Sequence, residues 1–246
     1  MEKNEFLTDP KKLVRLELKK QGFDIDKMIV PKRVYVLADS LYDEMLKRNC
    51  GTYQYPLGGK LYVFNANDNI GFVKGHMCSP AIATQAEDLI AGGVNELIHV
   101  GFAGGLQTDM LPGDIVVTDG AYNDTAVARL YGYDLDRIES SIELTDELCK
   151  MLSDNDIAYR RGVHWTTDAG YMESWGQVLA YREKGAQCVE MEGVGLFTVA
   201  AYRKCLATAI YVISDVLSEK GWNLGWDETK LEDSVQKIIN FIVSTV

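Results

Sequence analysis

Short apolar runs alternate with amphipathic stretches along the chain, and this alternation predicts strands and helices that follow one another. The predicted strands are 33–38, 53–55, 60–64, 70–73, 96–100, 114–118, 159–165, 188–191 and 207–213. The predicted helices are 39–46, 81–91, 145–155, 175–184, 193–204 and 231–243, whereas residues 123–137 have no regular pattern. This order is typical of an α/β sheet protein, and the lack of repeats or linkers predicts one main domain.

A separate helical pattern precedes the first strand. Residues 8–27 place leucines among many charges, and Asp9-Pro10 offers a cap and a first turn. We therefore interpret residues 1–30 as an N-terminal helical extension that packs on the main body, and residues 31–246 as the domain itself.

Composition narrows the class of protein. The formal net charge of -11 argues against a nucleic-acid partner, which needs a basic face. The five cysteines are scattered and never form a C-x-x-C pair, which is typical of reduced, mostly buried thiols. The three histidines lie far apart and show no metal-ligand spacing, and no apolar run has the length of a membrane span. A cytoplasmic protein that binds neither membrane nor metal is expected.

The stretch 189–195 places two carboxylates, Glu190 and Glu192, on either side of Met191 and just before an apolar helix. Residues i and i+2 of an extended segment point the same way, so both acids are expected to face one pocket. Acidic side chains also suit the start of a helix, and the stretch taken alone favours that simpler reading.

Two more features follow predicted strands, where open α/β sheets place their ligands. The glycine-rich loop 101–105 could bring backbone N–H groups to a substrate, although a tight turn explains it equally well. Asp215 ends an apolar strand, where burial could raise its pKa and allow it to donate a proton, although a helix cap would also explain it. The carboxylate of Glu192 suits the two hydroxyls of a sugar diol.

Together these segments resemble the nucleoside phosphorylase and nucleosidase family. The segments that carry the resemblance are 100–105 (G-x-A-G-G), 111–117, 189–192 (V-E-M-E) and 213–215 (S-D). They stand in the order of the family, and a weaker likeness extends back to Arg33. The resemblance implies a single α/β domain with a twisted central mixed sheet, a partial barrel, flanked by helices.

The resemblance also implies an activity, the cleavage of the N-glycosidic bond of a nucleoside by phosphate or water. Met191 and Glu192 would then hold the ribose, and Asp215 would protonate a purine at N7 as it leaves. The other substrate-binding candidates are Glu190, Gly101, Phe102, Ala103, Gly104, Tyr171 and Ser214. Among these Glu190 has the more structural character, and Tyr171 resembles an aromatic residue that stacks on the base. The resemblance implies a homo-oligomer, a dimer or hexamer, with phosphate as co-substrate and no other cofactor.

The chain departs from the family where phosphorolytic members hold phosphate. The corresponding positions are Ala38, Tyr42, His99 and Phe102, in place of two arginines, a glycine and a hydroxyl residue. Tyr42 cannot imitate the bidentate fork of an arginine. His99 would be a cation only if its pKa were raised, and a neutral core histidine is the simpler reading.

Three functions remain open on this evidence. Phosphorolysis is the first, because it dominates the family, and other groups could bind phosphate, namely Arg33, Lys74, His76, Arg129 or a neighbouring subunit. In the second, hydrolysis, Asp43 or Glu44 in the first helix of the domain would activate water. The third is a nucleoside-binding protein without activity, against which the intact Glu192 and Asp215 argue.

Overall fold

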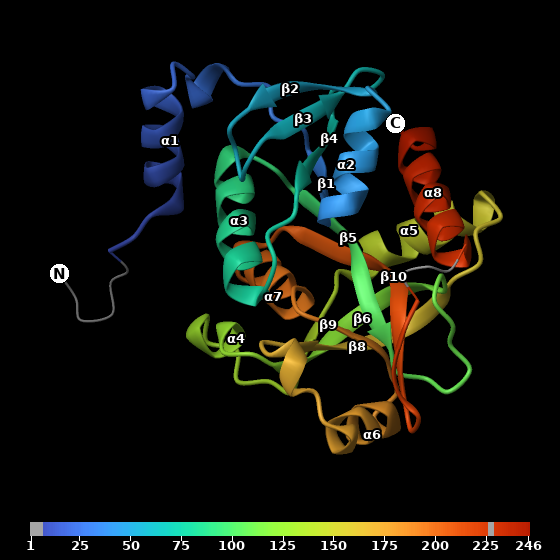
Figure 1. The fold of residues 1–246 in the computed structure, drawn as a ribbon. Coiled ribbons are helices and arrows are strands. Elements are labelled where there is room, and N and C mark those ends of the chain that lie inside the picture. Colours follow the sequence, from blue (N-terminus) through green and yellow to red (C-terminus); the bar gives the residue numbers. More distant parts are fainter. Residues whose placement is uncertain (1–6, 226–228) are drawn as a thin grey trace.

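A mixed sheet of eleven strands forms the centre of the computed structural model, which describes residues 7–225 and 229–246. Helices cover both faces of this sheet (Figure 1). The strands are β1 (Arg33–Leu37), β2 (Gly51–Tyr55), β3 (Leu61–Phe64), β4 (Ile70–Lys74), β5 (Glu96–Gly105), β6 (Ile115–Asp124), β7 (Arg137–Glu139), β8 (Arg160–Thr167), β9 (Ala186–Glu190), β10 (Leu206–Ser218) and β11 (Gly221–Leu224). The helices are α1 (Pro10–Lys20), α2 (Asp39–Lys47), α3 (Ser79–Gly92), α4 (Val127–Leu130), α5 (Ile142–Asp154), α6 (Trp175–Glu183), α7 (Gly193–Arg203) and α8 (Thr229–Ser244), with 3-10 turns η1 (Ile25–Lys27) and η2 (Gly170–Met172).

Part of the sheet closes into a ring. Strand β10 pairs with β6, β6 with β8, β8 with β9, β9 with β5, and β5 again with β10. The remaining strands β1, β4, β3 and β2 extend as an open sheet from β5. This mixed sheet with a partial barrel, in a single α/β domain, confirms the predicted fold class.

The two faces of the sheet belong to two apolar clusters, because side chains alternate along each strand. On β10, Ala209, Tyr211 and Ile213 pack towards α3 and α7, whereas Ile210 and Val212 pack towards α2, α5 and α8. This alternation sets the position of the candidate site, because Tyr211 faces the side on which α7 begins.

Three predicted elements differ from those observed in and around the barrel. The glycine-rich segment Gly101 to Gly105 is not a loop, because it continues β5 and pairs with both β9 and β10. Strand β10 runs on to Ser218 and turns back into β11, a hairpin that the apolar pattern did not predict because all four residues of β11 are exposed. Helix α5 begins at Ile142 rather than at Thr145, whose hydroxyl is buried against Thr208.

The N-terminal helix is shorter than predicted, and the chain after it is less regular. Helix α1 ends at Lys20, and Gly22 then takes a positive φ of 86° before the turn η1. Its buried residues Val14 and Leu18 belong to the cluster of α3 and α7, so the segment packs on the body as expected. The division of the chain at residue 30 stays a prediction.

Two further findings concern the whole described chain. All five cysteines are free, and Cys149, Cys188 and Cys205 are buried. Among the helices of residues 7–225 and 229–246, none is long and apolar enough to cross a membrane.

Helices α3 and α7 approach so closely that a side chain at Gly195 has no room. A Cβ at this position would lie 2.3 Å from the carbonyl oxygen of Ser79 and 2.8 Å from its Cα. We expect Gly195→Ala to force the two helices apart and to lower the free energy of unfolding by about 1–3 kcal/mol. The control is Gly176→Ala in α6, where the nearest atom is 3.9 Å away. Urea denaturation of both variants tests this, and equal stabilities would contradict it.

Candidate active site

Strand register brings the separate motifs of the sequence together at one edge of the barrel. Gly104 of β5 is paired with Asp215 of β10 on one side and with Val189 of β9 on the other. The stretch that contains Glu190 and Glu192 and the strand end that carries Asp215 therefore lie on either side of one glycine.

Asp215 and Val189 approach Gly104 so closely that a side chain at this position would meet both of them. A Cβ there would lie 3.1 Å from Oδ2 of Asp215 and 3.3 Å from Cγ1 of Val189. A β-bulge in β10 places Ser214 opposite no residue of β5, because the register shifts between Ile213 and Asp215. This bulge turns the half-buried Asp215 to its observed position beside Gly104.

Both carboxylate oxygens of Asp215 accept a hydrogen bond. The Ser214 hydroxyl donates to Oδ1 at 2.6 Å, and the indole Nε1–H of Trp222 donates to Oδ2 at 2.6 Å. Trp222 lies in β11, the hairpin strand that the sequence did not predict. The sequence analysis missed this indole, because its contact to Asp215 depends on the hairpin.

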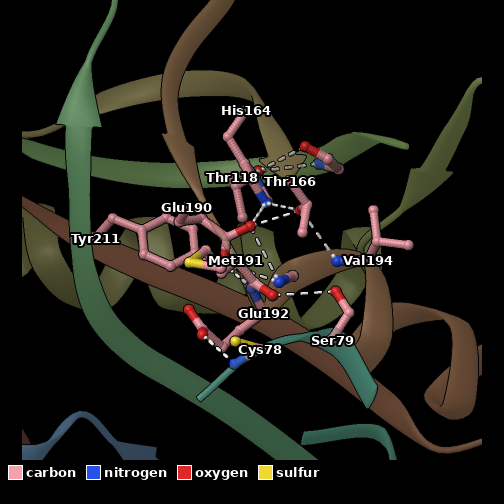
Figure 2. A network of polar contacts seen from close by, with 12 residues as sticks. Cys78, Ser79, Thr118, His164, Thr166, Glu190, Met191, Glu192, Val194 and Tyr211 are labelled. Atoms are coloured by element: carbon pink, nitrogen blue, oxygen red, sulfur yellow. Dashed lines mark hydrogen bonds and ion pairs between the residues drawn. The ribbon is translucent and has the colours of Figure 1, made fainter. Parts of the chain in front are cut away.

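Glu190 is buried at the centre of a polar network (Figure 2). The hydroxyl of Thr166 on β8 donates to its Oε1 at 2.5 Å, and that of Tyr211 on β10 donates to Oε2 at 3.0 Å. Nε2 of His164 lies 3.0 Å from Oε1. Burial by itself would raise the pKa of Glu190, but the charge and hydrogen bond of His164 and the hydroxyl of Thr166 outweigh it, so its pKa lies well below the usual range.

The same carboxylate also holds the start of α7. The backbone N–H groups of Glu192 and Gly193 each donate to Oε2 of Glu190 at 2.8 Å, and the N–H of Val194 donates to the Thr166 hydroxyl at 3.2 Å. These are the amide groups that a helix start leaves without partners inside the helix. Glu190 therefore fixes the start of α7 to the end of β9.

Both ring nitrogens of the buried His164 have polar partners. Nδ1 lies 2.6 Å from Oγ1 of Thr118, which in turn lies 2.8 Å from the carbonyl oxygen of Gly120. Nε2 lies 3.0 Å from Oε1 of Glu190 and 3.3 Å from Oγ1 of Thr166. These contacts join β8 to β6 and β9 through one buried ring.

Glu192 does not share a pocket with Glu190, contrary to the expectation from their spacing. Strand β9 ends at Glu190 and the backbone of Glu192 is already helical, so the two side chains diverge. Oε1 of Glu192 accepts from the N–H of Cys78 at 2.6 Å, as Figure 2 shows. Burial, followed by the charge of Glu190, raises the pKa of Glu192 to about 8.

The segment before α3 supports this carboxyl from the other side. Cys78 has a positive φ of 73°, which a residue with a side chain rarely adopts and which turns its N–H towards Glu192. The next residue, Ser79, donates through its hydroxyl to the carbonyl of Met191 at 3.1 Å. The start of α3 is thereby fastened to the turn that contains Met191 and Glu192.

The positions that correspond to a phosphate site are neutral. Tyr42 is buried against Tyr62 and Phe72, with ring centroids 6.2 and 6.1 Å apart. The partly buried Ala38 and Phe102 pack against the same apolar cluster. Burial raises the pKa of Tyr42 to about 12. None of these three side chains offers an anion a positive charge.

His99 is also neutral. It is 3% exposed, and its Nδ1 has no hydrogen-bond partner in the described part of the chain. Burial, which outweighs the charge of Glu190, lowers the pKa of His99 to about 4. A Cβ at Gly101 would lie 2.9 Å from Cε1 of the ring and 3.3 Å from its Nε2, so the ring leans towards the glycine-rich end of β5.

Three other predicted site residues lie apart from this cluster. Asp43 is on the exposed side of α2, and Glu44 pairs with Lys47 and accepts from Gln236 of α8. Tyr171 is 95% exposed, so the structure does not bring its ring to Met191. These three residues were assigned from motif position alone, and the structure leaves Asp43 and Tyr171 exposed and Glu44 in contact with α8.

The alternative cations lie outside the cluster as well. Arg33 pairs with Glu96 at 2.6 Å and with Glu147 at 2.9 Å, and Lys74 pairs with Asp39 at 3.0 Å. His76 and Arg129 are exposed.

The sequence analysis missed several groups that the fold brings to this edge. They are Thr118, His164 and Thr166 around Glu190, Cys78 beside Glu192, and Trp222 beside Asp215. The partners of Thr118, His164, Thr166 and Cys78 lie far away in sequence, and the contact of Trp222 depends on the hairpin of β10 and β11. Within residues 7–225 and 229–246, no group of three or more His, Cys, Asp or Glu side chains could hold a metal ion.

A family comparison agrees with this geometry. The family model of the phosphorylase superfamily matches residues 31–245, and the chain belongs to that superfamily. This confirms the family resemblance of the motifs.

Individual relatives carry more specific names. A purine nucleoside phosphorylase of the DeoD type from Exiguobacterium sibiricum is 28% identical over 197 residues, which cover 76% of this chain and 79% of that protein. A guanosine phosphorylase from Halorubrum lacusprofundi is 30% identical over 173 residues, which cover 68% of this chain and 71% of that protein.

Solved structures share the fold. Purine nucleoside phosphorylase from Toxoplasma gondii, in complex with immucillin-H, superimposes with a TM-score of 0.75 at 16% identity, over 90% of this chain and 91% of that one. The P. knowlesi homologue of the P. falciparum enzyme gives a TM-score of 0.69 at 20% identity, over 88% and 91% of the two chains.

Glu190→Gln tests the buried network. The variant removes the buried carboxylate that accepts from Thr166, Tyr211 and the first amides of α7, and we expect the free energy of unfolding to fall by about 3–5 kcal/mol. Because the folded-state pKa of Glu190 is lowered, the carboxylate stabilises the fold above its unfolded-state pKa near 4.5, and this contribution is lost as pH falls through the folded-state value. The difference in the free energy of unfolding between the wild type and Glu190→Gln should therefore become smaller below pH ~4.5. Glu192→Gln is the control, with a much smaller loss at neutral pH, and similar losses would contradict the assignment.

Proposed function

We propose that this protein cleaves the N-glycosidic bond of a purine nucleoside, with phosphorolysis as the first candidate reaction. The observation that carries the proposal is the position of Gly104 between Asp215 of β10 and Val189 of β9, because Val189 begins the stretch that leads to Glu192 at the same edge of the barrel. The carboxyl group of Glu192 suits the hydroxyls of the ribose, and the carboxyl group of Asp215 suits proton transfer to the leaving base. The names of the relatives, purine nucleoside phosphorylase and guanosine phosphorylase, support the same substrate class.

In this mechanism Glu192 and Met191 hold the ribose. The raised pKa of Glu192 keeps its carboxyl protonated near neutral pH in the absence of a sugar, so it can both donate to and accept from the two hydroxyls of a diol. The bond from C1′ to the base breaks through an oxocarbenium-like state, in which negative charge develops on the purine. Asp215, held by Ser214 and Trp222, delivers a proton to the base as it leaves.

Hydrolysis is the second candidate, and a specific observation favours it. The positions expected to hold phosphate are Ala38, Tyr42, His99 and Phe102, none of which supplies a cation. Water is neutral and needs no arginine. Of the two acids expected to activate the water, Asp43 is exposed on α2, and Glu44 is held by Lys47 and by Gln236 of α8.

Dependence on phosphate separates the two reactions. We expect purine nucleosides to release free base at least ~10-fold faster with inorganic phosphate than without it, with ribose 1-phosphate as the second product. The measurement is chromatography of base and sugar products over a panel of adenosine, inosine, guanosine and uridine. Equal rates with ribose as the product would replace phosphorolysis by hydrolysis, and no release from any nucleoside would reject enzymatic cleavage.

Asp215→Asn tests the base side of the site. The amide cannot relay a proton, so we expect kcat to fall by about 10²- to 10⁴-fold while nucleoside affinity changes little. Steady-state kinetics combined with equilibrium binding measures both quantities. Asp109→Asn is the matched control, because Asp109 is an exposed carboxylate paired with Arg160 away from this edge. Wild-type turnover in Asp215→Asn would show that Asp215 does not act in proton transfer.

A further inference from the structure

A buried glutamine lies behind the turn that contacts Glu192. Gln85 on α3 is 1% exposed, and its side-chain amide bonds to the backbone of two turns. Nε2 donates to the carbonyl oxygens of Gly58 at 2.6 Å and Lys74 at 2.7 Å, and Oε1 accepts from the N–H of His76 at 2.9 Å. One side chain of α3 therefore ties the turn before β3 to the turn after β4.

The pattern of donors and acceptors around Gln85 requires an amide. Two carbonyl oxygens face its nitrogen and one N–H faces its oxygen, so a reversed amide would set the oxygen against both carbonyls. A buried polar group that loses its partner costs free energy, and an apolar residue of the same size would take this partner from all three backbone groups. The three contacts of Gln85 therefore act as a unit.

The turn after β4 carries these contacts towards the proposed ribose site. The N–H of His76 is held by Gln85, and two residues later the N–H of Cys78 donates to Oε1 of Glu192 at 2.6 Å (Figure 2). Met77 separates these two amides, and its side chain is 73% exposed, so it does not anchor the turn in the core. The hydrogen bond to Gln85 is thus the nearest fixed point before Cys78.

The backbone of Cys78 depends on contacts on both sides. Its φ of 73° is a conformation that a residue with a side chain rarely adopts, and such a conformation persists only where the surroundings hold it. After Cys78 in the chain, Ala81 and Ile82 donate through their N–H groups to its carbonyl at 3.1 and 3.0 Å. Before it, the contact is that of His76 with Gln85. Loss of this earlier contact lets φ relax and turns the N–H of Cys78 away from the carboxyl that it holds.

We propose that Gln85 is a positioning residue for sugar recognition, which sets the direction of the Glu192 carboxyl through His76 and Cys78 and thereby favours nucleosides with both the 2′- and the 3′-hydroxyl. This inference rests on the proposed function, in which Glu192 binds those hydroxyls. Gln85 has no part in bond cleavage itself, so its removal affects selection of the sugar and not proton transfer to the base.

Gln85→Met tests the proposal, because methionine has a similar volume but no amide. The readout is the ratio of kcat/KM for a purine ribonucleoside to kcat/KM for its 2′,3′-dideoxy derivative, which lacks both hydroxyls. We expect Gln85→Met to lower this ratio about tenfold through poorer use of the ribonucleoside, while the dideoxy derivative stays within about twofold of its wild-type value. An unchanged ratio would overturn the proposal.

Two further variants separate this role from stability. Leu89→Ala is the matched control, because Leu89 is buried one turn further along α3, where a Cβ at Gly58 would lie 2.7 Å from its Cγ. It should destabilise the same packing but keep the ratio. Gln85→Glu keeps an oxygen that accepts from His76, and its buried carboxyl takes up a proton that one of the two carbonyls accepts. Its ratio should stay within about threefold of the wild type, and a loss of about tenfold in Gln85→Glu or Leu89→Ala would overturn the assignment.

Hydrogen exchange without substrate distinguishes this inference from the proposed function. In protein labelled with ¹⁵N-cysteine, the amide of Cys78 is compared with that of the buried Cys205, which donates to the carbonyl of Ala200 at 2.9 Å and reports overall stability. The ratio of the two exchange rates, Cys78 to Cys205, should rise at least ~10-fold in Gln85→Met.

The two kinds of failure give different results. If no nucleoside is cleaved but the ratio of exchange rates rises in Gln85→Met, the proposed function fails and the positioning of Glu192 by Gln85 stands. If nucleosides are cleaved and the ratio of exchange rates does not change, the positioning role is rejected and the proposed function stands.

Discussion

The buried negative charge of Glu190 is the constraint on which the geometry of this edge depends. A carboxylate cannot remain charged in an apolar core without partners, and its partners come from several elements: His164 and Thr166 from β8, Tyr211 from β10, and the first amides of α7. Satisfying one charge therefore fixes two strands and a helix relative to β9. The chain turns directly after Glu190, and this turn points Glu192 away from the core and towards Cys78.

Backbone geometry determines the position of Asp215 relative to β5 and β9. Gly104 lets β9 and β10 approach β5 from both sides, and the bulge at Ser214 changes the direction of the strand just before Asp215. The positions of Val189 and Asp215 are thus set by one continuous sheet, which is more rigid than a loop. The positive φ of Cys78 is a local strain at this point, and it serves to direct an N–H to Glu192.

The chain belongs to the phosphorylase superfamily, but the residues at the positions expected to hold phosphate differ from those of phosphorolytic members. The carboxyls and glycines match the family motifs, whereas Tyr42, His99 and Phe102 form a neutral surface where an anion would need cations. The described site is rich in carboxyl groups, which Glu190, Glu192 and Asp215 contribute.

The sequence by itself determined the order of most strands and helices and the fold class, because local apolar periodicity and short motifs carry that information. It did not determine that Gly101 to Gly105 continue a strand, that Glu190 and Glu192 diverge, or that Tyr171, Asp43 and Glu44 lie apart from the site. The contacts of His164 with Glu190 and of Cys78 with Glu192 also join residues far apart in sequence. Only the closed sheet and the packing of α3 against α7 bring such partners within hydrogen-bond distance, so only the tertiary structure decided them.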